Sequence, residues 1–113
     1  MFTEQALGSL RALGQESRLA AFRTLVQAGP AGLPVGQLRE KLQLPPATLS
    51  AHLNVLRAAG LVSNQRQGRV IRIRANFTRM NQLLAYLTEN CCAGGECTPA
   101  SGCAAPYCQE TAP

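Results

Sequence analysis

The sequence has no long apolar run and no secretion signal. Nowhere do eighteen consecutive residues have apolar side chains, and residues 1–10 have neither the basic start nor the apolar core of a signal peptide. We therefore expect a soluble, cytoplasmic protein with no membrane partner. At 113 residues, 46% of them hydrophobic, the chain has material for one small domain, whose core would grow if two subunits paired.

Cysteine is absent from residues 1–90, and all five cysteines lie between Cys91 and Cys108. Gly, Ala, Pro, Ser and Thr dominate this region, so we expect little regular structure in it. The sequence therefore predicts two parts, a folded domain over residues 1–90 and a flexible, cysteine-rich tail over residues 91–113. Clustered cysteines in a reducing compartment more often bind an ion or respond to oxidants than form structural disulfides.

Basic residues outnumber acidic ones, and they are unevenly distributed. The chain has 11 Lys or Arg and 6 Asp or Glu, a net charge of +5. Residues 1–90 hold all 11 basic residues but only 4 of the acidic ones, which leaves +7 on the domain and −2 on the tail. A small domain with this excess suits a polyanion, and nucleic acid is the commonest polyanion in a cell.

Apolar residues recur at helical or strand spacing through most of residues 1–90. The order of the predicted elements is that of a winged helix-turn-helix, a mainly α fold with a small β-hairpin, with about five helices and a two-stranded wing. The predicted helices cover residues 3–13, about 17–28, 35–42, 46–59 and 76–89, and the predicted strands cover residues 61–63 and 70–74.

The helix predicted over residues 46–59 has two distinct faces. Leu49, Leu53 and Leu56 recur at i, i+4 and i+7 and should be buried. The opposite face carries small and polar side chains, which can enter a major groove and contact bases or phosphates. His52 lies beside the buried face, where it either contacts a phosphate or supports the turn. The expected DNA-binding residues of this helix are Ala47, Thr48, Ser50, Ala51, His52 and Asn54.

The predicted hairpin places Arg66, Gln67 and Arg69 around Gly68. Two cations on a turn can reach a phosphate backbone or a minor groove, so we expect these three side chains to bind DNA. Arg72 and Arg74 alternate with apolar residues, as in a strand with one face in water.

The cysteines indicate a site for a soft ion. Cys91 and Cys92 are adjacent, so they are poorly placed to bond each other but well placed to hold one ion together with a third thiolate. Trivalent arsenic or antimony suits three sulfur ligands. Cys97 closes the shortest loop and is the preferred third ligand, with Cys103 as the alternative and Cys108 as a bystander.

Other roles for the thiols stay open. A cadmium or lead sensor could use four or five thiolates, and a redox switch could oxidise Cys91 or Cys92 to a disulfide with a tail cysteine. Catalysis is disfavoured, because no basic residue lies among the cysteines to lower a thiol pKa and no nucleophile and base are visibly paired.

Three segments resemble the ArsR/SmtB family of metalloregulatory repressors, and within it the arsenical-responsive members. They are ESRLAAFRTLVQAG, LSAHLNVLRAAGLV with the following RQGR, and YLTENCC. The pattern Ser-x-His-Leu-x-x-Leu-x-x-Ala-Gly-Leu-Val, from Ser50 to Val62, is similar to that family's recognition-helix signature. The ending LTENCC is similar to the subgroup that places its arsenic thiols just beyond the last helix.

The resemblance implies a homodimer that binds double-stranded operator DNA of dyad symmetry and leaves it when arsenic(III), the inducer, is bound. The first and last helices would join the subunits, through Leu7, Leu10, Met80, Leu83, Leu84 and Leu87. Better-known arsenic-responsive members place Cys-x-Cys-x-x-Cys near the DNA-binding helix, whereas residues 33–40 contain no cysteine here. This departure moves the expected sensor to Cys91 and Cys92.

Overall fold

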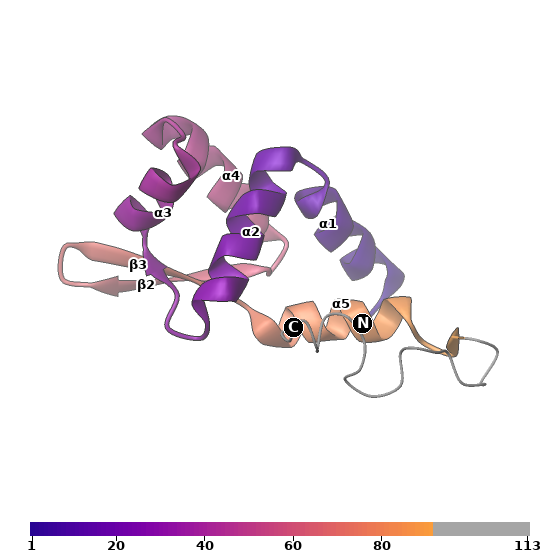
Figure 1. Ribbon diagram of the computed structural model, residues 1–113. Coiled ribbons are helices and arrows are strands. Elements are labelled where there is room, and N and C mark those ends of the chain that lie inside the picture. Colours follow the sequence, from indigo (N-terminus) through magenta and orange to yellow (C-terminus); the bar gives the residue numbers. More distant parts are fainter. Residues whose placement is uncertain (92–113) are drawn as a thin grey trace, which may run out of the picture.

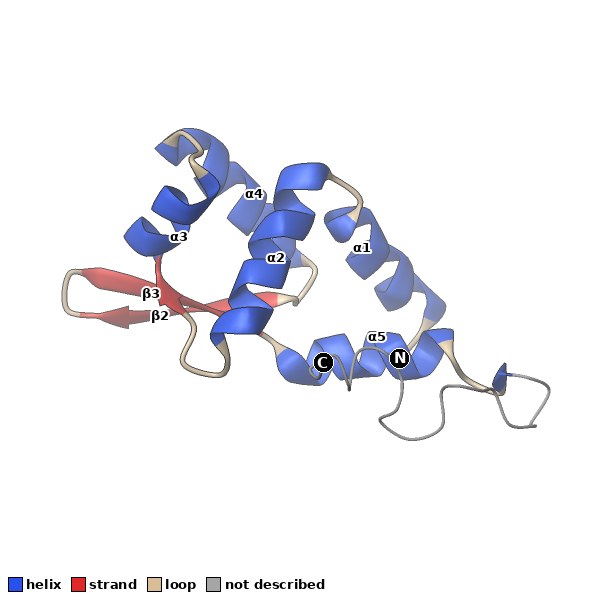
Figure 2. Ribbon diagram, viewed as in Figure 1, coloured by secondary structure: helices blue, strands red, loops and turns tan. Residues whose placement is uncertain are grey.

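The computed structural model describes residues 1–91, which form five helices and a three-stranded sheet (Figure 1). The sheet hairpin projects at one end of the molecule and the last helix extends toward the other (Figure 2). None of the helices in this part of the chain is long and apolar enough to cross a membrane. The elements are α1 (Thr3–Leu13), α2 (Glu16–Ala28), β1 (Leu33–Pro34), α3 (Val35–Leu42), α4 (Pro46–Ala58), β2 (Val62–Gln67), β3 (Val70–Ala75) and α5 (Phe77–Leu87).

The winged helix-turn-helix prediction is confirmed, with small differences at the element ends. Helix α2 begins at Glu16, one residue earlier than predicted, and the side chain of its N-cap, Gln15, accepts a hydrogen bond from the Arg18 backbone amide. Strand β2 continues to Gln67, so the connection to β3 is a tight turn at Gly68 and Arg69 instead of the predicted six-residue loop. The sequence indicated a shorter strand because the polar residues of β2 do not alternate with apolar ones, yet the backbone of β2 pairs with β3 along its whole length.

One leucine-rich core holds α2, α3, α4 and the sheet together. Leu25, Leu38, Leu56 and Leu61 are fully buried, and Ile73 of β3 is 1% exposed. Burying each of these side chains contributes roughly 1.5–3 kcal/mol, so this cluster is the main source of stability.

Helix α1 turns its small residues toward the core. Ala6, Ser9 and Ala12 are buried, whereas Leu7 and Leu10 are 43% and 41% exposed. Small side chains allow α1 to approach its neighbours closely, and the two leucines are left on the outer surface.

The sheet has a third strand that the sequence analysis did not predict. Leu33 and Pro34 pair with Ile73 and Arg72, which places β1 at the edge of the sheet in the order β1-β3-β2. Proline is tolerated at an edge because its missing N–H leaves no ladder bond unmade there. Gly32, just before β1, has φ +68°, and a Cβ at this position would lie 2.1 Å from the Ile73 carbonyl oxygen.

The turn between α3 and α4 contains a non-glycine residue in the left-handed region. Gln43 has φ 54° and ψ 45°, and its backbone N–H donates to the Arg39 carbonyl. A side chain costs free energy in this conformation, which glycine adopts freely.

Gly32→Ala should lower the free energy of unfolding by roughly 3 kcal/mol or more, because the new methyl group meets the β3 backbone in a left-handed conformation. Urea denaturation would measure the loss. Gly8→Ala is the control, since Gly8 lies in α1 with open space around its Cβ position and should gain stability. Equal stability of Gly32→Ala and the native chain would contradict the close approach.

Gln43→Gly should raise the free energy of unfolding by about 0.5–1 kcal/mol, because it removes the strain at this turn. The same replacement at Gln37, an exposed position inside α3, should instead cost about 1 kcal/mol. Thermal unfolding of both variants would show opposite shifts. A loss of stability in both would mean that Gln43 is unstrained.

Candidate nucleic-acid interface

Helices α3 and α4, joined at Gln43, Leu44 and Pro45, form a helix-turn-helix. Pro46 is the first residue of α4, where its missing N–H breaks no helical hydrogen bond. The leucine stripe of α4 is buried, as the periodicity predicted, with Leu49, Leu53 and Leu56 between 0% and 4% exposed. This packing fixes the rotation of α4 about its axis and therefore decides which side chains face outward.

The outward face of α4 carries the residues that the sequence analysis selected. Ala47, Thr48, Ser50, Ala51 and Asn54 are exposed, and His52 is half-buried. Asn54 is not wholly available, because its side-chain oxygen accepts a short hydrogen bond from the Arg57 guanidinium. The face therefore presents two hydroxyl groups and small apolar side chains on a helix that can lie close to another surface.

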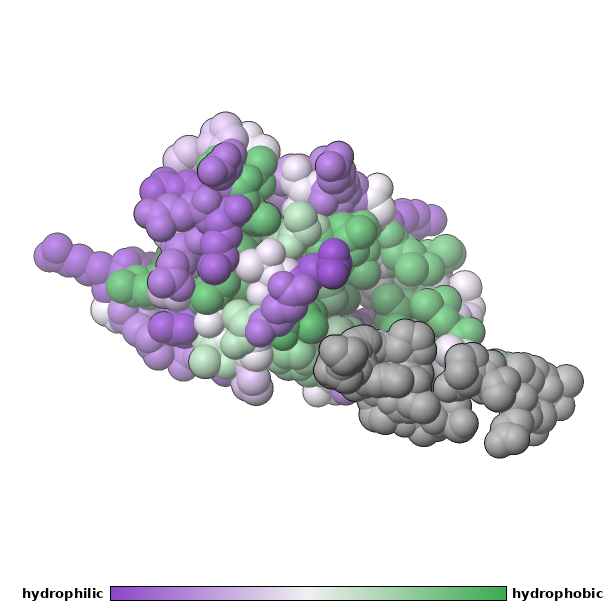
Figure 3. Space-filling model, viewed as in Figure 1, coloured by the Kyte–Doolittle hydropathy of each residue, from purple (hydrophilic) through white to green (hydrophobic). Residues whose placement is uncertain are grey.

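The chain from the end of α3 to α5 is basic. The sequence has no acidic residue between Glu40 and Glu89 but seven basic ones, namely Lys41, Arg57, Arg66, Arg69, Arg72, Arg74 and Arg79. Figure 3 shows hydrophilic residues gathered over α3 and at the tip of the hairpin. A surface that combines an exposed helix with unopposed cations is suited to a polyanion.

The hairpin tip presents the three predicted side chains to solvent. Arg66, Gln67 and Arg69 are all exposed, and Gly68 at the turn has φ 64°. The Arg66 Nε donates a weak hydrogen bond of 3.3 Å to the Gly68 carbonyl, so the guanidinium stays near the tip. The wing therefore places two cations at the end of the molecule farthest from α5.

Arg72 has a structural role that its alternating pattern did not reveal. One of its guanidinium nitrogens donates to the Ala31 and Gly32 carbonyl oxygens at 3.1 and 3.2 Å. These bonds tie the loop before β1 to the sheet. They depend on residues forty positions apart in the sequence, so no local pattern could have indicated them.

A second exposed surface lies at the opposite end of the molecule, on α1 and α5. Leu7 and Leu10 of α1 and Leu84 and Leu87 of α5 are 41–54% exposed. Leu83 differs from the others, because it is 5% exposed and packs within its own subunit. Met80 is half-buried.

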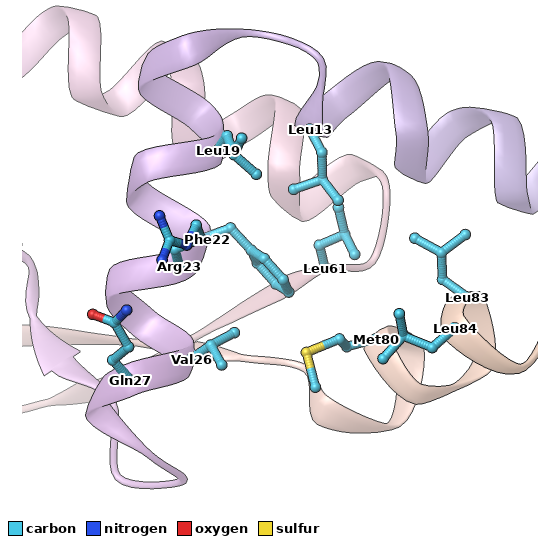
Figure 4. Close-up of a pocket in the computed structure, with 10 residues that line it drawn as sticks. All are labelled: Leu13, Leu19, Phe22, Arg23, Val26, Gln27, Leu61, Met80, Leu83 and Leu84. Atoms are coloured by element: carbon cyan, nitrogen blue, oxygen red, sulfur yellow. The ribbon is translucent and has the colours of Figure 1, made fainter. Parts of the chain in front are cut away.

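An apolar cavity of about 440 Å³ adjoins this surface, between α2 and α5 (Figure 4). Phe22 and Val26 project into it from α2, and Met80 and Leu84 project from α5. Its other lining residues are Leu13, Leu19, Arg23, Gln27, Leu61 and Leu83. Because monomers rarely leave large contiguous apolar patches in water, this end of the molecule is suited to pairing.

The thiol segment begins where α5 ends. Cys91 is exposed, four residues beyond the end of α5, and its backbone amide donates to the Thr88 carbonyl. One turn earlier, the Tyr86 hydroxyl lies 2.6 Å from the Thr3 hydroxyl, so a hydrogen bond joins α5 to the start of α1. Cys92, Cys97, Cys103 and Cys108 lie outside the described residues. Residues 1–91 by themselves contain no group of three His, Cys, Asp or Glu side chains that could hold a metal ion.

Comparisons with known proteins agree with this arrangement. The helix-turn-helix domain family matches residues 13–64. The HTH-type transcriptional regulator YceK of Bacillus subtilis is 41% identical over 59 residues, which cover 52% of this chain and only 58% of YceK. The biofilm growth-associated repressor of Agrobacterium fabrum is 34% identical over 87 residues, which cover 77% of this chain and 72% of that protein.

The solved structures lead to the same group of proteins. An ArsR-like transcriptional regulator from Rhodococcus sp. RHA1 superposes with a TM-score of 0.67 and 30% identity, over 80% of this chain and 82% of that one. Its family consists of DNA-binding regulators rather than enzymes. From the shared fold, the exposed α4 face and these identities, we conclude that the chain belongs to the ArsR family of helix-turn-helix transcriptional regulators.

Proposed function

We propose that this protein is a cytoplasmic, homodimeric repressor that binds operator DNA and leaves it when trivalent arsenic is bound by cysteine thiolates. Antimony(III) would act in the same way. The ligands would be Cys91, Cys92 and Cys97, with Cys103 as the alternative third ligand. The observation that carries this proposal is the exposed Cys91 four residues beyond the end of α5, the helix whose Leu84 and Leu87 remain exposed.

The donor set suits a thiophilic ion. All five cysteines fall between Cys91 and Cys108, and thiolates prefer soft ions over magnesium or calcium. The only histidine, His52, lies on α4 in the DNA-facing element, so a mixed Cys/His zinc site near Cys91 has no imidazole to use. Three sulfur ligands would satisfy arsenic(III) without any other side chain.

Exposed leucines on α1 and α5 support pairing of two chains. A second copy would remove the exposed parts of Leu7, Leu10, Leu84 and Leu87 from water. Because these side chains are only 41–54% exposed, each would add about half of the roughly 1.5–3 kcal/mol that full burial of a leucine contributes. Two copies related by a two-fold axis would present two α4 helices, each reading one half of a palindromic operator.

The position of Cys91 provides a route from ion binding to DNA release. Folding the tail around an ion would pull on the end of α5, and the Thr3–Tyr86 hydrogen bond joins that end to α1. A shift at either helix changes the pairing of the subunits and hence the spacing of the two α4 helices. Coupling of this kind is typically about 1–3 kcal/mol, or 5- to 150-fold in affinity.

Removing the wing cations should weaken DNA binding in a salt-dependent way. The double variant Arg66→Gln with Arg69→Gln should reduce the slope of log affinity against log salt by about 3.6, since the homodimer loses four phosphate contacts that contribute about 0.9 each. Fluorescence anisotropy with a duplex selected by the native chain would measure this. The control double variant Arg11→Gln with Arg23→Gln removes the same charge from α1 and α2, on the side of the proposed subunit pairing, so its dimeric state is measured as well. An equal loss of salt slope in a control that still forms a dimer would contradict a wing contact.

Arsenite should release the native chain from DNA under reducing conditions. Cys91→Ser, Cys92→Ser and Cys97→Ser should still bind the duplex but should no longer be released, whereas Cys108→Ser should respond as the native chain does. The same anisotropy assay, titrated with arsenite, would distinguish these outcomes.

Two results would contradict the arsenic proposal. A native chain that ignores arsenite but is released by cadmium or lead would be a sensor of those cations. A chain that is released by an oxidant, restored by a simple reductant and insensitive to arsenite would be a redox switch.

A further inference from the structure

We infer that the groove between α3 and α4 is a binding subsite for a DNA backbone phosphate, with Arg39 as the residue that contacts it. This inference rests on the DNA binding of the proposed function and extends the interface from α4 and the wing to α3. It does not depend on the identity of the inducer.

The groove adjoins the outward face of α4. It has a volume of about 350 Å³ and is lined by Val35, Gly36 and Arg39 from α3 and by Pro46, Leu49 and Ser50 from α4. Ser50 is shared between this groove and the exposed α4 face described above. The only polar side chains in the lining are the Arg39 guanidinium and the Ser50 hydroxyl, which are a cation and a hydrogen-bond donor for an anionic group.

Arg39 is available for an external partner. Its side chain is exposed, and no hydrogen bond or ion pair within residues 1–91 engages its guanidinium. Other arginines of the same domain are held, since Arg57 donates to Asn54 and Arg72 donates to two carbonyl groups of the preceding loop. The neighbouring Glu40 forms no ion pair with Arg39 in this part of the chain, so the positive charge in the groove is not neutralised.

Gly36 is a second, independent indication that something approaches the groove from outside. Glycine is unfavourable in a helix, yet Gly36 lies in the first turn of α3, and a Cβ there would meet no atom within 4 Å. Packing within the subunit therefore does not require a glycine at this position. Bare backbone at the lip of a groove is suited to the close approach of a ligand.

The geometry favours a phosphate over a base as the group that Arg39 contacts. In a helix-turn-helix, the second helix enters the major groove while the first crosses the sugar-phosphate backbone. Arg39 comes from the first helix, and the groove that it lines reaches the α4 face at Ser50. Its contact would position α4 in the major groove without reading sequence.

The test compares Arg39→Gln with Lys41→Gln, which removes the same charge from the same helix at a position outside the groove lining. With a duplex selected by the native chain, in the absence of arsenite, Arg39→Gln should weaken binding by about 5- to 30-fold. It should reduce the salt slope by about 1.8, since the homodimer loses one contact of about 0.9 from each subunit. Lys41→Gln should change the affinity less than about threefold, because a surface charge that contacts no phosphate attracts DNA only through its screened long-range field. Arg39→Lys should recover part of the loss.

A modified duplex makes the contact specific. Replacing single phosphates by neutral methylphosphonates should weaken native binding at the phosphate that Arg39 contacts, and this position should no longer matter to Arg39→Gln. Gly36→Leu should raise the melting temperature of the free protein but weaken DNA binding, so loss of stability could not explain the loss of affinity.

Two outcomes would overturn the inference and are distinguishable from each other. If the native chain binds the duplex and Arg39→Gln matches Lys41→Gln in affinity and salt slope, the subsite does not exist, while the proposed repressor is unaffected. If the native chain binds no DNA, both this subsite and the proposed function fail.

Discussion

The burial of the α4 leucine stripe is the interaction on which the rest of the interface depends. Leu49, Leu53 and Leu56 pack with Leu38 and Leu61, and together they fix α4 against α3 and the sheet. Because these leucines are so completely buried, α4 cannot rotate without exposing several of them, at roughly 1.5–3 kcal/mol each. The outward position of Thr48, Ser50 and Ala51 follows from this constraint rather than from any property of those residues themselves.

The wing is attached to the same core by two contacts that involve backbone. Gly32 brings the loop before β1 within van der Waals distance of β3, and Arg72 binds the carbonyl groups of that loop. These contacts anchor the base of the hairpin, while its tip remains exposed with two arginines. A rigid base and a free tip are what a hairpin needs in order to meet a backbone at a defined distance from α4.

The end of the molecule opposite the wing is incompletely covered, for a physical reason. A domain of this size buries a limited share of its apolar surface, and α1 buries Ala6, Ser9 and Ala12 while Leu7 and Leu10 stay exposed. Its leucines, together with those of α5 and the apolar cavity beside Met80, remain for a second subunit. Because the thiol segment starts just beyond α5, the proposed ion binding and the proposed subunit pairing would act on the same helix.

The type and order of the five helices and of the two wing strands followed from the sequence, because apolar spacing reports whether a segment is helical or extended, but the two-residue strand β1 did not. The exposed side of α4 also followed from the sequence, since a helix with a single leucine stripe can bury only one face. The position of every cysteine beyond residue 90 can be read directly. Tertiary structure alone decided which face of α1 is buried, because a leucine stripe looks the same whether it packs on its own core or on a partner. It also decided the pairing of Leu33 with Ile73, the anchoring role of Arg72 and the position of Arg39 and Ser50 on one groove, since each involves segments that only the packed core brings together.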